Sequence, residues 1–452
     1  MTLTSVSQAR PFVAASATRA ASAAPQQSAT PGDSVTIGQQ QPPAQQPPVQ
    51  QPPTQPQPPQ QPPAPPQPEL KDWTVLIYSV SDNNLYSYMQ GDLDEAERVG
   101  STPEMNLVAE TSHQPRGGNV VRLKLEADST PGITSPVLQD LGKTHDMAKS
   151  ASLADSIAWA MKEYPSKHFM LICSDHGAGW KGAHHSESTD SWMTAGDLKS
   201  AMLSAQEQTG KKIDVLGFDE CLMASTEIAH ELKDCADILV ASEEVEGGAG
   251  WQYDEALGKK TSNSNSRILS PKVLNYAAAA LRARDPLTPQ DMAKAIVTMA
   301  EGHQRDLGTM SAIDLTKMPA LSAAVDNFAG AVIDSGKTAA DFRPVYQQTQ
   351  KFYDFGDMGH FVELAGQKFG GTIGDAADQV KAALTDAVIA EQHSTRYPNA
   401  KGLNIELDKQ YGEFTAIPNM EADDQNRLSF DRYSNTDWAK DTRWDEMLKK
   451  VR

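Results

Sequence analysis

Three short apolar runs in the middle of the chain alternate with segments of helical length, and this alternation strongly constrains the fold. The runs are 168–173, 212–218 and 237–242, and helical patterns at 196–208 and 222–233 separate them. Strands joined by helices of this length form right-handed crossovers in a mainly parallel sheet. Further strands are predicted at 73–80, 106–111 and 120–125, and further helices at about 82–99 and 147–163. Residues 71–265 are therefore predicted to form a doubly wound α/β domain.

Beyond residue 265, alanine-rich helical segments replace the alternation of strands and helices. Residues 266–452 are accordingly predicted to form a mostly helical C-terminal domain. The predicted helices are 271–283, 289–304, 319–335 and 374–391, with short strands at 310–313 and 402–407.

The first 70 residues are predicted to be disordered. Between Gln39 and Pro68 all but four positions are Gln or Pro, a composition with nothing to bury that favours extended polyproline II. This linker is interpreted as a passive spacer, with a polyproline-binding partner as the alternative. The run 12–15 is too short for the apolar core of a signal peptide, so the compartment is left open.

The charge and the cysteine content exclude several classes of protein. The formal net charge of -19 would repel a phosphate backbone, which argues against a nucleic-acid partner. No apolar run reaches about 18 residues, so no membrane span is predicted. The three cysteines, Cys173, Cys221 and Cys235, form neither a disulfide framework nor zinc-ligand spacing.

Unusual residues follow two of the predicted strands. His176 and Gly177 come just after the run 168–173, and Cys221 comes just after the run 212–218. Because the carboxyl ends of parallel strands share one sheet edge, a His and a Cys are expected to meet there. A thiolate needs a basic neighbour, and the same imidazole can later protonate a leaving amine.

Backbone N–H groups at Gly177 and Cys221 could stabilise an oxyanion, and a helix predicted from residue 222 would favour a thiolate at Cys221. A structural interpretation competes, since a single Cys is often a buried hydrophobe and a single His is often a satisfied polar group. That structural interpretation is adopted for Cys173 and Cys235. On spacing alone, the catalytic and structural interpretations of His176 with Cys221 remain equally open.

The strings at 175–180 and 218–223 resemble the two signatures of the clostripain family of cysteine peptidases. The resemblance spans roughly residues 72–452 and implies a caspase-like fold with a His176–Cys221 dyad. It also implies cleavage after Arg or Lys through a thioester acyl-enzyme, with Asp219 as the acid that binds the basic side chain. Further matching strings lie at 82–85, 241–244, 250–253, 311–315, 402–405 and 442–444.

The resemblance extends to further features of the site. Glu244 and Trp251 are expected to flank the substrate pocket, and Lys181 and Lys199 are candidate processing sites between the two signatures. No cofactor is required for the chemistry, although calcium dependence is known in the family and is left open here. Family members suggest a secreted or cell-surface protein, with protein or peptide substrates that contain Arg or Lys.

Two departures from the family pattern bear on activity. Ser174 stands where a bulky aromatic is common, and Glu220 replaces a small residue beside the nucleophile. Glu220 would raise the pKa of the thiol if it pointed into the site, but neighbours on an extended segment point to opposite sides, so it is expected to point away.

Two alternatives to the peptidase remain. One is a catalytically weak, peptide-binding relative tethered by its polyproline tail. The other is a metal-dependent hydrolase that would use Asp175, His176, His184 and His185. His184 and His185 are instead interpreted as solvated loop residues, so no metal site is predicted.

Overall fold

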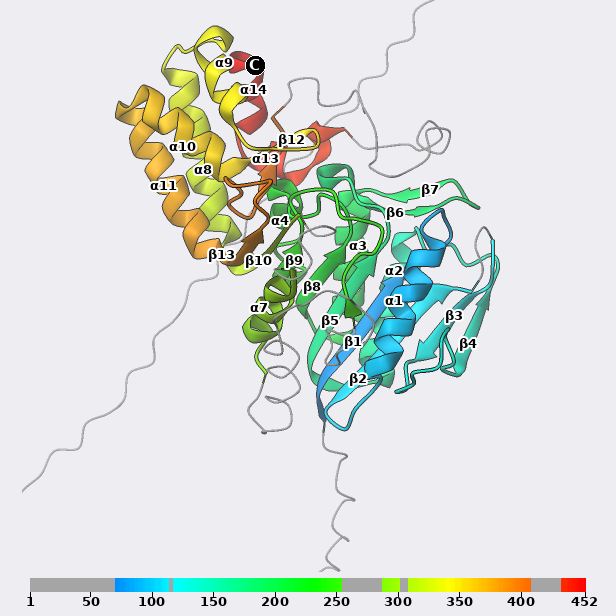
Figure 1. Cartoon of the computed structure of the whole chain (residues 1–452). Helices are drawn as coiled ribbons and strands as arrows, with labels where there is room; N and C mark the ends of the chain where they lie inside the picture. The colour runs from blue at the N-terminus through cyan, green and yellow to red at the C-terminus, as the bar shows by residue number, and fades with distance from the viewer. Residues whose placement is uncertain (1–69, 114–116, 254–286, 301–307, 408–431) are drawn as a thin grey trace, which may run out of the picture. The chain divides into compact units, whose positions relative to one another are not determined.

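The computed structural model describes residues 70–113, 117–253, 287–300, 308–407 and 432–452 (Figure 1). All of these residues belong to one compact unit. Several sequence predictions lie outside the described residues: the Gln/Pro-rich linker, the N-terminal region up to residue 69, the helix at 271–283 and the domain boundary at 265.

Nine of the described strands form one mixed sheet, in the order β13-β10-β9-β8-β5-β1-β2-β3-β4. The five from β9 to β2 run parallel to their neighbours, while β3 and β4 at one edge and β10 and β13 at the other pair antiparallel. The predicted fold class, a mainly parallel sheet flanked by helices, is therefore confirmed. The strands are β1 (Lys71–Ser79), β2 (Met105–Ser112), β3 (Val120–Lys124), β4 (Val137–Gly142), β5 (Ser166–Ser174), β8 (Ile213–Asp219), β9 (Ala236–Ala241), β10 (Thr309–Asp314) and β13 (Val388–His393).

Helices cover both faces of this sheet (Figure 1). On one face, side chains of α1 (Tyr86–Val99) and α7 (Pro289–Ala300) belong to the same apolar cluster as Trp73, Val75 and Ile77 of β1. On the other, α2 (Ser150–Glu163) and α3 (Ala195–Thr209) enclose the alternate β1 side chains Leu76 and Tyr78. A strand buried on both faces must be apolar throughout, which explains the continuous hydrophobic run at this position.

The C-terminal helices gather beyond the β10–β13 edge of the sheet (Figure 1). The prediction of a helix at 374–391 is wrong at its end, because the chain turns extended at Val388 and pairs antiparallel with β10. Sheet pairing has here overridden the helical pattern of the sequence. The helices are α8 (Met318–Asp334), α9 (Ala339–Gln348), α10 (Met358–Phe369), α11 (Gly371–Ala387), α13 (Asp437–Asp441) and α14 (Trp444–Val451).

Two small sheets and one short helix complete the part of the chain that is described. The strands β11 (Lys351–Phe352), β12 (Phe355–Asp357) and β14 (Asn404–Ile405) form one small sheet, and β6 (Ala183–Ser186) pairs with β7 (Ser191–Met193) in a hairpin. Helix α4 (Thr226–Glu231) is shorter than the predicted helix at 222–233. Leu222 has a positive φ of 68° and donates its N–H to Glu244, so this residue forms a turn instead.

Candidate active site

Two neighbouring parallel strands bring His176 and Cys221 to the same edge of the sheet. Ser174, the last residue of β5, is the register partner of Asp219, the last residue of β8, and His176 and Cys221 each lie two positions further on. Both residues line one pocket. The loops approach closely, because a Cβ added at Gly177 would lie 2.5 Å from the carbonyl oxygen of Cys221.

Asn84, in the loop between β1 and α1, orients the imidazole of His176. The distance from Asn84 Oδ1 to His176 Nε2 is 2.8 Å. With an amide oxygen as acceptor, Nε2 carries the proton and Nδ1 of the neutral ring is the basic nitrogen. From the sequence, Asn84 was placed only within the matching string at 82–85, although its position after a strand at the same sheet edge could have suggested this contact.

The Cys221 thiol lies in a buried and acidic environment. Its Sγ is 3.8 Å from the carbonyl oxygen of Glu246. Burial, followed by the negative charge of Glu246, raises the pKa of the thiol above its usual range. The expected assistance from a helix N-terminus is reduced, because α4 begins only at Thr226 and the field of a helix terminus acts over about one turn.

Asp219 forms part of an acidic pocket next to the thiol. Its carboxylate accepts hydrogen bonds from the N–H of Trp251 at 3.0 Å and from the hydroxyl of Tyr253 at 2.8 Å. Burial raises its pKa to about 6. A Cβ at Gly250 would lie only 2.7 Å from Asp219 Oδ1, so the 250–253 segment closes tightly around this acid.

Two more acids line the pocket, and sequence reasoning missed both of them. Asp92 comes from α1 and Glu246 from the segment after β9. Burial and then the charge of Asp219 raise the pKa of each carboxyl. Because these residues are 127 and 27 positions from Asp219 respectively (219 − 92 and 246 − 219), the sequence held no local signal for this convergence.

Glu244 and Trp251, expected to flank the pocket, instead contact residues next to it. The indole of Trp251 packs beneath β8, where a Cβ at Gly217 would lie 2.8 Å from the ring. The Glu244 carbonyl oxygen accepts the N–H of Leu222, the residue after Cys221. Neither is among the residues that line the described pocket.

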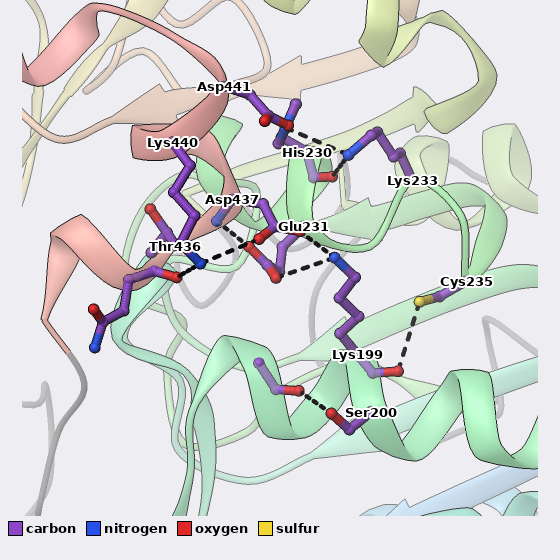
Figure 2. Close-up of polar contacts among 12 residues, drawn as sticks. Lys199, Ser200, His230, Glu231, Lys233, Cys235, Thr436, Asp437, Lys440 and Asp441 are labelled. Atoms are coloured by element: carbon purple, nitrogen blue, oxygen red, sulfur yellow. Dashed lines mark hydrogen bonds and ion pairs between the residues drawn. The ribbon is translucent and has the colours of Figure 1, made fainter. Parts of the chain in front are cut away.

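Lys181 and Lys199, the candidate processing sites, lie in ordered structure. Lys181 is buried at the end of the short helix η1 (Gly179–Lys181), with its Nζ 5.6 Å from the ring of Phe355. Lys199 lies within α3 and forms ion pairs with Glu231, at 3.4 Å, and with Asp437 (Figure 2). Cleavage after either lysine would require local unfolding of its segment.

The interpretation of His184 and His185 as solvated residues is wrong, because the structure buries both. They belong to β6, and the His185 N–H donates to the carboxylate of Asp175. In the part of the chain that the structure describes, no group of three or more His, Cys, Asp or Glu residues is arranged to hold a metal ion.

Comparison with known proteins identifies the family. A model of peptidase family C11, described as the clostripain family, matches residues 77–450. The chain belongs to the clostripain family. Clostripain from Hathewaya histolytica is 22% identical over 441 residues, covering 81% of this chain and 83% of that protein. This clostripain-family chain is therefore a cysteine-type endopeptidase that acts on peptide or protein substrates.

Solved structures support the caspase-like fold of this clostripain-family chain. An inactive zymogen C11 protease from Parabacteroides distasonis is 21% identical, with a TM-score of 0.57, and covers 83% of this chain and 99% of its own. A secreted C11 cysteine protease from Bacteroides thetaiotaomicron, bound to an irreversible peptide inhibitor, is 17% identical with a TM-score of 0.54 and the same coverage. None of the described helices is long and apolar enough to cross a membrane.

Proposed function

We propose that this clostripain-family chain cleaves peptide bonds after Arg or Lys, with Cys221 as nucleophile and His176 as general acid and base. The observation that carries the proposal is the position of Asp219, whose carboxyl group lies in the same pocket as His176 and Cys221. A cation in that pocket would form charge-assisted hydrogen bonds while its scissile carbonyl lies beside the thiol.

The acids around the pocket favour a cationic side chain over a neutral or anionic one. Burial raises the pKa values of Asp92, Asp219 and Glu246, and the charge of Asp219 adds to this rise at Asp92 and Glu246. A guanidinium or ammonium group would compensate this charge and stabilise the ionised carboxylates, whereas an acidic side chain would add to the repulsion.

The proposed reaction begins with transfer of the Cys221 thiol proton to Nδ1 of His176 as sulfur attacks the carbonyl carbon. Asn84 accepts the Nε2–H and so stabilises the imidazolium that forms. The N–H groups of Gly177 and Cys221 would receive the developing oxyanion. His176 then protonates the leaving amine as the C–N bond breaks, which leaves a thioester that water hydrolyses with the same imidazole as base.

The proposal is tested with fluorogenic peptides that end in Arg, Lys or Asp. Cleavage after Arg and Lys but not Asp is expected, together with labelling of Cys221 by an arginyl chloromethylketone. Cys221→Ala should abolish both signals. The matched control is Cys235→Ala, because Cys235 is a buried thiol outside the pocket lining, with its Sγ 3.9 Å from the Lys199 carbonyl oxygen of α3, and its loss should leave cleavage intact (Figure 2). Equal cleavage of all three peptides, or of none, would contradict the proposal.

A further inference from the structure

The carboxyl group of Glu220 lies against the imidazole of His184, directly beside the proposed nucleophile. The distance from Glu220 Oε1 to His184 Nε2 is 3.1 Å, and both side chains are 0% exposed. Glu220 immediately precedes Cys221 and also lines the pocket. An isolated buried carboxylate at this position would be costly to desolvate and would repel a thiolate. The contact with His184 therefore bears on the reactivity of Cys221.

His184 is also connected to the other proposed catalytic residue. Its backbone N–H donates to the carbonyl oxygen of His176 at 3.1 Å. Its φ of 60° places it in the left-handed region, which is uncommon for a residue with a side chain, and its ring centroid lies 5.5 Å from that of Tyr78. One buried residue thus contacts the backbone of His176 and, through Glu220, the segment that carries Cys221.

The surroundings of the pair explain why it should be neutral. Burial and the charge of Asp219 raise the pKa of Glu220, and burial lowers the pKa of His184 to about 3. Both directions favour the state in which Glu220 is a carboxylic acid and His184 a neutral imidazole, so the pair carries no net charge. The groups that face the pair are Tyr78, Cys173, Asp175, Asp219, Cys221 and Glu246.

We propose that His184 and Glu220 are positioning residues that join the two catalytic loops and keep negative charge away from the Cys221 thiol. The role rests on the proposed function, since it supposes that Cys221 is the nucleophile. Neither side chain is required to exchange a proton with substrate. Their contribution is to hold the loop geometry and to neutralise a carboxyl group one residue from sulfur.

The test compares His184→Ala, Glu220→Gln and the double variant. Without the His184 ring, Glu220 loses part of the packing that shields it from water, so it ionises at lower pH and its charge raises the pKa of the thiol. For His184→Ala we expect kcat to fall about tenfold or more with little change in KM, and the descending limb of the kcat/KM profile, which reports the thiol, to move about one pH unit higher. Glu220→Gln cannot ionise and should keep that limb at its wild-type pH. The double variant should return the limb to the wild-type position, although the lost contact keeps kcat low.

Alkylation of Cys221 by iodoacetamide across pH provides a readout that does not depend on peptide cleavage. It should show the same upward shift for His184→Ala and the same reversal in the double variant. If wild-type protein cleaves no peptide, the proposed function fails, while these alkylation profiles still test the pair.

The matched control is His393→Ala, because His393 forms a more exposed His–Glu pair with Glu391 at 2.7 Å in β13. It should leave both profiles unchanged. Circular dichroism verifies that each variant is folded. His184→Gly replaces His184→Ala if that variant does not fold, since Gly also removes the ring and tolerates the positive φ at this position. An unshifted limb in a folded His184 variant, or a shift that the double variant does not reverse, would overturn the proposal.

Discussion

The side-chain oxygen of Asn84 lies 2.8 Å from Nε2 of His176, so a residue from the loop after β1 holds the imidazole that follows β5. These two strands are direct neighbours in the sheet. The contact assigns the Nε2 proton to the neutral ring and leaves Nδ1 as the basic nitrogen.

Replacement of Asn84 by Ala should lower kcat about 100-fold, because the ring loses the acceptor that orients it and stabilises its protonated form. Replacement by Asp should instead raise the imidazole pKa, since a carboxylate favours the cation, and move the ascending limb of the pH–rate profile higher, because His176 must be unprotonated to accept the thiol proton. Steady-state kinetics on an Arg-ended peptide measures both effects.

The control for Asn84 is Asn119→Ala, which removes an exposed amide that donates to Asp140 at 2.7 Å. This variant should retain wild-type rates. Wild-type kcat in Asn84→Ala would show that the contact with His176 is not needed for the reaction.

Asp219→Asn should lower kcat/KM on Arg-ended peptides about 100-fold, or about 3 kcal/mol, because a charge-assisted interaction becomes a neutral one. Burial raises the pKa of Asp219 to about 6, so wild-type kcat/KM should rise as this acid ionises between about pH 5 and 7. The variant should lack that rise. Kinetics from pH 4.5 to 8 checks both expectations.

Asp237→Asn is the matched control for Asp219, since Asp237 is an exposed acid that pairs with Lys212 at 3.1 Å. It should change neither kcat/KM nor its pH dependence. If the Asp219→Asn enzyme keeps its preference for Arg, the other acids of the pocket determine the specificity instead.

Gly177→Ala should reduce activity by about 100-fold or more and lower the melting temperature. The added Cβ would lie 2.5 Å from the Cys221 carbonyl oxygen and 2.9 Å from Met223 Cγ, so the two loops would have to separate. Gly196→Ala in α3 is the control, because its nearest contact would be 3.8 Å away and Ala favours a helix. Equal effects of both changes on kcat would refute this steric explanation.

Glu243 and Asp357 form a buried pair of carboxyl groups at the end of β9, and Glu243→Gln should change how stability depends on pH. Burial raises the pKa of Asp357 to about 7, and burial and the charge of Asp357 raise that of Glu243. The folded protein therefore holds protons that the unfolded chain releases near pH 4, so ionisation of this pair lowers the free energy of unfolding as pH rises from about 4 to about 7.

In Glu243→Gln, the new amide donates to Asp357 at any pH. The decline in the free energy of unfolding with pH should therefore become smaller, by an amount on the order of 1–2 kcal/mol. Thermal unfolding at pH 5, 6, 7 and 8 measures the change. Glu207→Gln, at an exposed position of α3, should leave the slope as it is in the wild type. A Glu243→Gln protein with the wild-type slope would mean that another group titrates.

The local pattern of the sequence was sufficient to predict the parallel strands and the positions of His176 and Cys221 at their ends. A strand buried on both faces must be apolar throughout, so β1, β5, β8 and β9 were visible without any knowledge of their partners. The antiparallel edge strand β13 was not visible, because Val388–His393 follows a helix directly and becomes a strand only by pairing with β10.

The sequence by itself determined the order of strands and helices, the composition of the sheet core, and the residue types delivered to one sheet edge. Only the tertiary structure decided which side chains meet there: Asn84 with His176, Asp92 and Glu246 beside Asp219, and His184 with Glu220. The physical reason is the distance along the chain over which each effect acts. Propensity and hydrophobic periodicity act over a few residues, whereas these contacts depend on strand register and on loops that fold back from distant positions, which no local pattern encodes.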